Sequence, residues 1–476
     1  MAHNLKIYSN SIHTGRLAAS ELTVFLARDA ESGERVLGVR GSADAVRLPF
    51  TQPLFTQDGD QFFALNPENA AILRKIFSWL MPAPMDAGKG GAAVPSFGFG
   101  DRLGLATPGH ISAVCGTKFG PIFAQQSVRE NARTGRTPQQ VMDDAKRAVE
   151  AANWDSPWGA DADHLRTLED IPTFVETGYT FYTVDPGEYV DNAADADPLD
   201  VLKQKVARFN WDELSALYLY QNCEQVWCQF EAESLMRATV KYGGAIQHAV
   251  AMFNHLCQMK DEFDFEVSVD ETDSPTTPLE HFFIANELTR LGVRFTSLAP
   301  RFIGRFEKGA DYIGDLNTLD AEFAKHALVT KNFGTYKLSL HSGSDKFSVY
   351  PLIAKHWGER IHVKTAGTSY LEALRVLANH EPDLFLKIYS LGCERYEIDR
   401  RTYHVSANLE MLPKDGDLPS LLNDFHAREV LHVTFGSALA QYGVELKAAL
   451  VEHEAAYYNG LRAHFDKHLC LLKEQE

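Results

Sequence analysis

The sequence predicts an α/β protein built on a (β/α)₈ barrel of the TIM type, with a small N-terminal α+β segment and a helical insertion. From about residue 97, short apolar runs that end in polar residues recur, and amphipathic helical stretches separate them. Eight such runs occur, which is the number of strands in that barrel. The 476 residues are enough for one large domain with appendages.

The eight expected strands lie at residues 102–107, 122–127, 158–163, 180–185, 265–271, 294–300, 337–341 and 361–364. Strands that alternate with helices favour parallel pairing through right-handed crossovers. An open doubly wound sheet is the alternative. It usually contains a glycine-rich phosphate turn, and neither GxGxxG nor GxxxxGK[ST] occurs in this chain.

The last two runs show how the barrel would present functional groups. Lys337, Ser339 and His341 alternate with leucines, and His362 and Lys364 alternate with apolar residues. A period of two indicates a strand. Polar side chains at the carboxyl ends of barrel strands are typical of catalytic groups, whereas the alternative is a sheet with one solvated face.

The domain organisation follows from changes in composition. We expect an N-terminal extension at 1–95, with a hairpin at 22–39, a helix at 69–80 and a Pro/Gly/Ala-rich linker at 81–95. The barrel would span 96–440, including the helical insertion at 187–264, which is too long for one crossover helix and suggests a lid or a homo-oligomer contact. Residues 428–437 predict a strand or a buried helix start, and 441–476 a closing C-terminal helix.

Composition and charge exclude several classes of protein. The net charge of −18 disfavours nucleic-acid binding, so a small-molecule ligand is expected, and an anionic one would need a local group of Arg and Lys. No run of about 18 apolar residues predicts a membrane span, and the first residues do not resemble a secretory signal. The six cysteines show no paired spacing, which favours free thiols and a cytoplasmic location.

Three histidines end or follow predicted strands: His164, His341 and His362. Imidazole is a common ligand of divalent transition metals, and three inward nitrogens can bind one face of an ion. We therefore expect one divalent ion, Zn, Mn, Fe, Co or Ni, at these residues. His432 and His110 are alternative ligands, and a lone histidine is often an ordinary core or surface residue.

Carboxylates occur at the same strand ends. Asp163 precedes His164, and Asp270 and Glu271 follow the run Phe-Glu-Val-Ser-Val. Inversion at a carbon needs a base on one face of the substrate and an acid on the other. We expect Asp163 and Glu271 to be this catalytic pair, with Asp270 as the alternative to Glu271 and Asp161 in reserve, unless these acids cap the following helices.

Cations near the strand ends suggest an anionic substrate. Arg301, Lys346 and Lys364 are expected to hold its carboxylate, with Gln126 and Ser342 on hydroxyl groups and Arg102 as a further substrate-binding residue. Many such cations form ordinary ion pairs instead.

Several blocks of sequence resemble the tagaturonate epimerase family. They include Gly-Asp-Arg-Leu-Gly-Leu-Ala from Gly100, Gly-Ala-Asp-Ala-Asp-His from Gly159, His-Ser-Gly-Ser-Asp-Lys-Phe from His341 and His-Val-Lys-Thr-Ala-Gly-Thr from His362. The blocks extend from about residue 96 to 437. The resemblance implies a metal-dependent barrel enzyme that inverts C3 of a keto-hexuronate and so interconverts tagaturonate and fructuronate in hexuronate catabolism.

The expected chemistry treats C3 as the neighbour of a 2-keto group. Loss of an acidic C3 proton would form an enediolate that a metal on the C2 oxygen stabilises, and solvent deuterium would enter at C3. Two alternatives are a metal-dependent barrel aldolase or isomerase for a phosphorylated sugar, with residues 364–368 as its phosphate loop, and a non-catalytic sugar-acid-binding protein.

Overall fold

The computed structural model divides the chain into two compact units. One contains Met1–Ala83 and Lys146–Trp158, and the other contains Pro84–Ala145 and Gly159–Glu476. The residues described are 3–7, 13–17, 20–30, 32–41, 50–66, 68, 69, 72, 81–86, 94–152, 154, 156–219, 229–414 and 416–473.

The first unit contains an antiparallel sheet of six strands in the order β1-β3-β4-β6-β5, with β2 paired to β3. The strands are β1 (Leu5–Ile7), β2 (His13–Leu17), β3 (Ser20–Asp29), β4 (Arg35–Arg40), β5 (Phe55–Gln57) and β6 (Asp60–Ala64). Alternate residues of β3 enter two clusters, Val24 and Leu26 in one and Phe25 and Ala27 in the other. β3 and β4 are the hairpin that the sequence predicts. The helix expected at 69–80 lies almost entirely outside the described residues.

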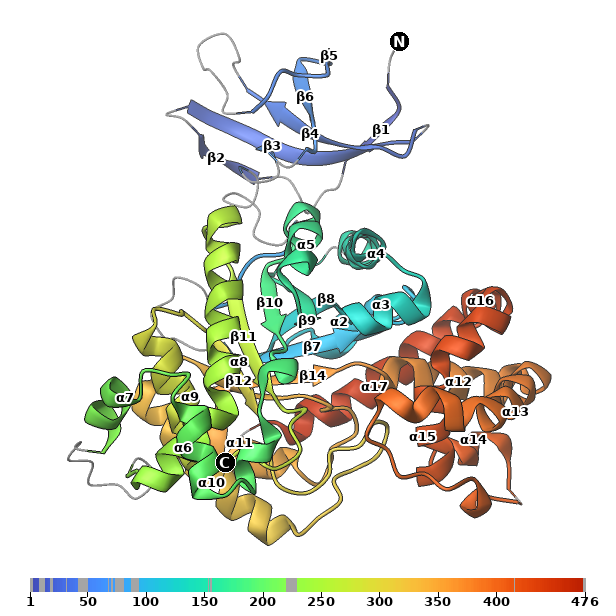
Figure 1. The fold of residues 1–476 in the computed structure, drawn as a ribbon. Helices are drawn as coiled ribbons and strands as arrows, with labels where there is room; N and C mark the ends of the chain where they lie inside the picture. Colours follow the sequence, from blue (N-terminus) through green and yellow to red (C-terminus); the bar gives the residue numbers. More distant parts are fainter. Residues whose placement is uncertain are drawn as a thin grey trace. The chain divides into compact units, whose positions relative to one another are not determined.

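The second unit is organised around a closed barrel of eight parallel strands in the order β10-β11-β12-β13-β14-β7-β8-β9 (Figure 1), so the predicted barrel is confirmed. The strands are β7 (Ser96–Gly100), β8 (Gly120–Ser127), β9 (Gly159–Leu165), β10 (Phe181–Val184), β11 (Asp264–Val269), β12 (Ser297–Pro300), β13 (Lys337–Leu340) and β14 (Ile361–Thr365). Seven of the eight predicted runs coincide with strands to within a few residues.

The first predicted strand was wrong. β7 is Ser96–Gly100, and residues 102–107 follow it and lead into α2 (Thr107–Val114). The run Ser-Phe-Gly-Phe-Gly gives a weak strand signal because alternate positions are glycine. Gly100 is required, because a Cβ atom there would lie 2.6 Å from the Thr365 carbonyl oxygen; a Cβ atom on Gly98 would lie 2.1 Å from Gln125 Oε1, so the Gln125 side chain would have to move.

Helices connect successive strands and continue after the last one. They are α3 (Val128–Thr134), α4 (Pro138–Ala151), α5 (Ile171–Thr177), α6 (Leu199–Val206), α7 (Trp211–Tyr218), α8 (Ala232–Met259), α9 (Pro278–Arg290), α10 (Leu316–Phe333), α11 (Tyr350–Trp357), α12 (Thr368–His380) and α13 (Pro382–Asp399). In the predicted insertion, α6 and α7 precede α8, and the 28-residue α8 is itself the crossover from β10 to β11.

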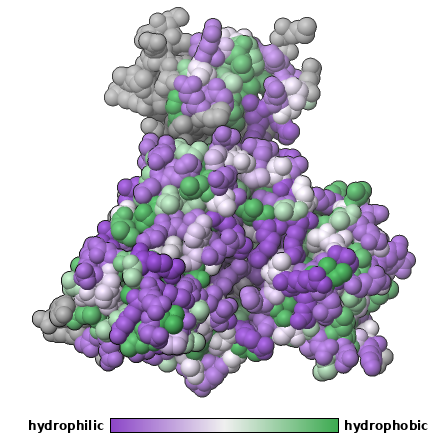
Figure 2. All heavy atoms as spheres, in the orientation of Figure 1, coloured by the Kyte–Doolittle hydropathy of each residue, from purple (hydrophilic) through white to green (hydrophobic). Residues whose placement is uncertain are grey.

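The regular elements in the described residues of the C-terminal part are all helices. After α13 come α14 (Leu418–Leu421), α15 (Phe425–Val433), α16 (Phe435–Glu452) and α17 (Glu454–Leu471). Residues 428–437 are therefore helical and do not form a strand. The sequence predicts a single closing helix, whereas the structure has two helices that meet at His453. α17 packs on α2 and α12. The face shown in Figure 2 is mainly hydrophilic, with apolar residues scattered over it.

The barrel interior is polar from one end to the other, unlike the branched aliphatic layers common in this fold. At the amino end, Lys337 on β13 forms an ion pair with Asp86 and donates to Ser96 Oγ at 2.7 Å. Asp264 on β11 accepts from the Met85 backbone N–H at 2.6 Å. Burial and the charge of Asp86 raise the pKa of Asp264 to about 6. Charged groups therefore close this end of the barrel.

A buried pair of carboxyl groups secures the segment that follows α13. Glu307 Oε2 and Glu429 Oε2 accept from the Ser406 backbone N–H at 2.9 and 3.0 Å, and Glu429 also accepts from the Ala407 N–H at 2.7 Å. Burial and the adjacent Glu307 carboxyl raise the pKa of Glu429 to about 8. Arg305 is the cation next to the pair, 3.3 Å from Glu307. One shared proton keeps the two carboxyl groups together.

This pair predicts a specific pH dependence of stability. A carboxyl group whose pKa is higher in the folded state binds more protons there, so it stabilises the fold at low pH. That contribution should be lost as the pH rises from about 4.5 to about 8. We expect thermal unfolding between pH 5 and 9 to show a smaller fall in Tm for Glu429→Gln than for the wild type. Exposed Glu410→Gln is the control, and identical pH profiles for all three proteins would contradict the shared proton.

Candidate active site

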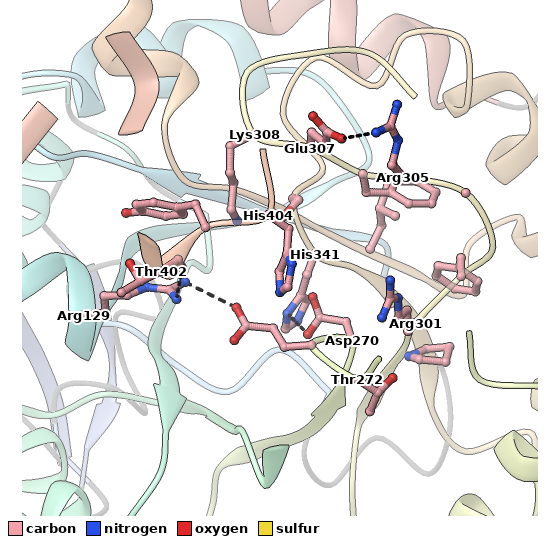
Figure 3. Close-up of a pocket in the computed structure, with 18 residues that line it drawn as sticks. Arg129, Asp270, Thr272, Arg301, Arg305, Glu307, Lys308, His341, Thr402 and His404 are labelled. Carbon is pink, nitrogen blue, oxygen red and sulfur yellow. Dashed lines mark hydrogen bonds and ion pairs between the residues drawn. The ribbon is translucent and has the colours of Figure 1, made fainter. Parts of the chain in front are cut away.

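A cavity of about 200 Å³ lies where the barrel strands end at their carboxyl termini (Figure 3). Its walls come from the segments after β11, β12 and β13, from Arg129 on α3 and from residues 402–404 beyond α13. The lining residues are Arg129, Asp270, Glu271, Thr272, Pro300, Arg301, Phe302, Gly304, Arg305, Phe306, Glu307, Lys308, Leu340, His341, Ser342, Thr402, Tyr403 and His404. Catalytic groups of TIM barrels lie at this end.

Three side chains at this end form a group suited to a metal ion: His164, Asp270 and His341, each with a ligand atom within 4.8 Å of the other two. His164 is near the end of β9 and has a φ of +56°, which is uncommon outside glycine. Asp270 and His341 directly follow β11 and β13. Three alternate strands of the barrel, β9, β11 and β13, thus supply two imidazoles and one carboxylate.

The second nitrogen of each imidazole supports this interpretation. His164 Nδ1 is 2.8 Å from Asp163 Oδ1, and His341 Nε2 is 2.7 Å from Glu266 Oε1. This leaves His164 Nε2 and His341 Nδ1 for an ion, and His341 Nδ1 is 3.2 Å from Asp270. Histidine ligands in metalloproteins usually donate their other N–H to a carboxylate in this way. The residues therefore fit a divalent transition metal bound at three positions, with further positions open to the cavity.

A buried ammonium group lies beneath these ligands. Lys364 Nζ on β14 is 2.7 Å from Asp161 Oδ2, 2.7 Å from Asp163 Oδ1 and 2.9 Å from Glu266 Oε1, and it also donates to Thr183 Oγ1. These partners belong to β9, β10 and β11, none of which pairs with β14. The contacts therefore cross the interior of the barrel.

These contacts shift the ionisation of every member of the network. Burial alone would lower the pKa of Lys364, but the three carboxylates raise it above its ordinary value. Burial would raise the pKa of Glu266, but Lys364 and His341 hold it well below its usual range. Asp161 lacks a histidine partner, and its burial raises its pKa to about 7. In the metal-free site the carboxylates of Asp270 and Glu266 overcome burial and raise the pKa of His341 to about 10.

The carboxylates predicted to be catalytic occupy different environments. Glu271 lines the cavity, where Arg129 lies 3.4 Å and Arg166 3.5 Å from its oxygens. Asp163 is 3% exposed, does not line the cavity, and accepts from both His164 and Lys364. Asp270 faces the two histidines. The structure thus places Glu271 on the cavity wall, where a substrate can reach it, and places Asp163 against His164 outside the cavity lining.

The three histidines predicted to bind a metal do not all lie together. His164 and His341 lie together, whereas His362 lies deeper in the barrel, with Nδ1 2.9 Å from Ser96 Oγ. Of the alternatives, His110 Nε2 is 2.8 Å from Ser369 Oγ and its ring stacks on Phe99. His432 is buried on α15. The structure brings none of these three into the ligand group, and Asp270 takes the third position.

The predicted substrate-binding residues divide in the same way. Arg301 and Ser342 line the cavity. Lys346 is fully buried and donates to the carbonyl oxygens of Glu307 at 2.8 Å, Ser344 at 3.0 Å and Ala310. Lys364 lies inside the barrel, so it is unavailable to the phosphate loop considered at 364–368. Both lysines are saturated by protein acceptors and do not face the cavity.

Arg102 and Gln126 are likewise engaged by the protein. The Arg102 guanidinium group bonds Glu130 at 2.7 Å and lies 3.7 Å above the Phe435 ring. Gln126 donates to Thr134 Oγ1 at 3.0 Å and accepts from Arg136 at 3.0 Å. Both are buried behind the cavity wall. They support the loops after β7 and β8 and do not line the cavity.

Several site residues were missed by the sequence analysis. Glu266 orients His341, and the alternation of Asp264, Glu266, Ser268 and Asp270 along β11 was the available signal. Residues 402–404 enter the cavity from a segment without strand or motif character, so no sequence signal identifies them. Lys308 and Arg129 also line the cavity; the sequence shows both among the cations near strand ends, but they were not among the substrate-binding residues predicted from it.

Two of the cavity cations are paired and two are not. Arg129 contacts Glu271, and Arg305 contacts Glu307. Among the described residues, the side chains of Arg301 and Lys308 have no ion-pair or hydrogen-bond partner, and both point into the region shown in Figure 3. Burial and the nearby Arg129 charge lower the pKa of Lys308. Arg301 and Lys308 are therefore the cations available to an anionic ligand.

Comparison with known proteins identifies the family. A family model described as tagaturonate epimerase matches residues 8–472. The chain belongs to the tagaturonate epimerase family. It is 40% identical over 462 residues to the tagaturonate/fructuronate epimerase of Thermotoga maritima, a match that covers 95% of this chain and 94% of that protein. The resemblance seen in the sequence blocks is confirmed.

Solved structures of the family show the same fold. A native crystal structure of the fructuronate-tagaturonate epimerase from Cohnella laeviribosi matches with a TM-score of 0.80 and 36% identity, covering 98% of this chain and 96% of that one. A complex of the same enzyme with two glycerol molecules gives 0.81, with coverage of 99% and 97%. In the part of this chain that the structure describes, no helix is long and apolar enough to cross a membrane.

Proposed function

We propose that this protein is an isomerase that interconverts the keto-hexuronates tagaturonate and fructuronate, with one divalent metal ion held by His164, Asp270 and His341. Family membership supports the reaction. The observation that supports the site is the arrangement of this ligand group, of which Asp270 and His341 line a cavity that also contains two unpaired cations. The four described cysteines are free thiols, which suits a reducing compartment such as the cytoplasm.

The stereochemistry of the two acids corrects the expected route. Fructose and tagatose differ only at C4, when the carbons are numbered from the CH₂OH group next to the ketone. In the corresponding uronates the same carbon is C3 when the carbons are counted from the carboxylate. The ketone is then C5, so C3 is two bonds from the carbonyl carbon and its hydrogen is not acidified. The expected enediolate route assumed a ketone next to C3. Abstraction of a C3 proton cannot therefore be the step that inverts this carbon.

Reversible cleavage of the C3–C4 bond accounts for the inversion. A base removes the proton of the C3 hydroxyl group, C3 becomes an aldehyde, and the electron pair of the C3–C4 bond moves into an enediolate over C4 and C5. The fragments are a 2-hydroxy-3-oxo acid and the enediolate of dihydroxyacetone. The aldehyde then rotates so that its opposite face meets the enediolate, and the C3–C4 bond re-forms with C3 inverted. A divalent ion, when bound, supplies the Lewis acidity that stabilises negative charge on the ketone oxygen.

The remaining steps belong to the side chains of the cavity. Glu271 is the carboxylate that lines the cavity beside the ligand group and is the base for the C3 hydroxyl proton. Lys308 lies on another wall of the cavity, and its lowered pKa suits a group that donates and accepts a proton during the reaction. Arg301, with its free guanidinium group, holds the substrate carboxylate. The Pro300–Lys308 and 402–404 segments limit the space in which the aldehyde can turn.

The metal assignment can be tested by matched histidine variants. We expect Zn²⁺ or Co²⁺, measured by equilibrium dialysis and elemental analysis, to bind the wild type once per chain and His362→Gln almost as well. His341→Gln should bind at least tenfold more weakly, because the ion loses a ligand. Chelation should abolish activity and metal addition restore it. Full activity of a protein shown to be metal-free would contradict the assignment.

The bond-cleavage route predicts the fate of hydrogen at C3. The C3 hydrogen remains on the aldehyde, so product formed in deuterated water should contain no deuterium at C3 by NMR. Traces of dihydroxyacetone should accumulate when the enediolate is protonated. Glu271→Gln should reduce kcat by about 10²–10⁴-fold with normal metal content, whereas exposed Glu188→Gln should not. Stoichiometric deuterium at C3 would instead require migration of the carbonyl group along the chain.

The carboxylate assignment predicts a change in substrate preference. Arg301→Met should lower kcat/KM for tagaturonate by about 10–100-fold, since a charge-assisted hydrogen bond contributes roughly 1.5–3 kcal/mol. The uncharged ketose tagatose lacks the carboxylate, so its slower reaction should change little. Arg305→Met, on the same segment and paired with Glu307, is the control. Equal losses with both substrates would show that Arg301 does not hold the carboxylate.

A further inference from the structure

We propose that Lys364 is a positioning residue that orients both metal-binding histidines at once, through Asp163 and Glu266. This inference rests on the proposed metal site, because the ligands concerned are His164 and His341. It replaces the substrate-binding role that the sequence suggested for Lys364. The ammonium group is buried inside the barrel and does not line the cavity, so it acts through other side chains.

The argument begins with shared oxygen atoms. Asp163 Oδ1 is 2.8 Å from His164 Nδ1 and 2.7 Å from Lys364 Nζ. Glu266 Oε1 is 2.7 Å from His341 Nε2 and 2.9 Å from the same Nζ atom. One ammonium group therefore contacts the particular oxygen that accepts from each imidazole. Any movement of Nζ would displace both acceptors together.

The shared oxygens also select the tautomer of each histidine. Asp163 Oδ1 accepts a hydrogen bond from His164 Nδ1–H, which leaves Nε2 as the lone-pair donor. Glu266 Oε1 does the same at His341 Nε2 and leaves Nδ1, the nitrogen beside Asp270. Lys364 contacts both acceptor oxygens and so holds them in place in the buried interior of the barrel. The two histidines lie on strands that are not adjacent, so no backbone hydrogen bond could coordinate them directly.

A simpler role for Lys364 would be to offset buried negative charge. Asp161 makes it possible to separate the two roles, because it contacts Lys364 at 2.7 Å and Thr183 at 3.0 Å but neither histidine ligand. Replacing Asp161 together with Lys364 removes one of the buried acids along with the cation. Such a double variant leaves less uncompensated negative charge than Lys364→Met alone, without restoring the bridge between Asp163 and Glu266.

A second buried lysine provides the matched control. Lys337 is 1% exposed, lies in the same barrel interior and forms an ion pair with Asp86 at the amino end. It contacts no carboxylate that accepts from His164 or His341. Lys337→Met therefore removes an equally buried ammonium group and should destabilise the fold without changing the metal ligands.

The experiment compares metal binding with stability in the full-length variants. The probes are Zn²⁺ and Co²⁺ in equilibrium dialysis, the visible absorption spectrum of bound Co²⁺, and Tm without metal. We expect Lys364→Met and Lys364→Met/Asp161→Asn both to bind 10–100-fold more weakly than the wild type, with an altered Co²⁺ spectrum. Lys337→Met should lower Tm but keep the wild-type affinity and spectrum. Lys364→Gln is measured in place of Lys364→Met if that variant does not fold.

Three outcomes would overturn the inference. Affinity and spectrum within threefold of the wild type in Lys364→Met would show that the bridge does not matter. Recovery of affinity in the double variant would show that only charge matters, and equal loss in Lys337→Met would show a general effect of instability. A wild-type protein that binds neither ion would instead refute the proposed metal site itself, which is a different result from any of these three.

Discussion

The barrel depends on one buried charge interaction, the ammonium group of Lys364 among the carboxylates of Asp161, Asp163 and Glu266. Placing four ionisable groups in a water-excluded interior is costly unless each is paired and hydrogen-bonded. Here the carboxylates come from β9 and β11, across the interior from β14, so the pairing exists only when the sheet is closed. Asp163 and Glu266 also contact His164 and His341. The fold and the site therefore share one network.

The cations of this molecule differ in whether protein oxygens already accept all of their hydrogen bonds, and this distinguishes structural cations from those left for a ligand. Lys346 and Lys364 appear suitable for an anionic ligand in the sequence, yet protein oxygens satisfy both ammonium groups. Arg301 and Lys308 lie in the cavity without such partners. In the proposed site, these two unpaired cations are the groups through which an acidic protein would bind an acidic sugar. The net charge of −18 therefore does not predict the electrostatic potential inside the cavity.

The position of the inverted carbon constrains how this cavity can work. A centre two bonds from the ketone cannot be inverted by one proton transfer at carbon, so the proposed route has two requirements: a base at the hydroxyl group and room for an aldehyde to turn. Glu271 is the base proposed for the first requirement. The segment at 402–404, secured through Ser406 to the buried Glu307 and Glu429 pair, helps to define the second. Residues far from the barrel strands thus take part in shaping the reaction space.

The sequence by itself determined the barrel, seven of its strands and the family, because these depend on local periodicity and on blocks of contiguous residues. It also identified His164, His341, Asp270, Glu271, Arg301 and Ser342 as site candidates, since polar residues at strand ends converge in any parallel barrel. Only the tertiary structure separated His362 from the group of His164, Asp270 and His341, and Asp163 and Lys364 from the cavity lining. Depth along the barrel axis depends on strand register and shear, and the availability of a cation depends on its partners across the interior. The spacing of residues along one strand predicts neither the depth of a residue in the barrel nor the availability of a cation.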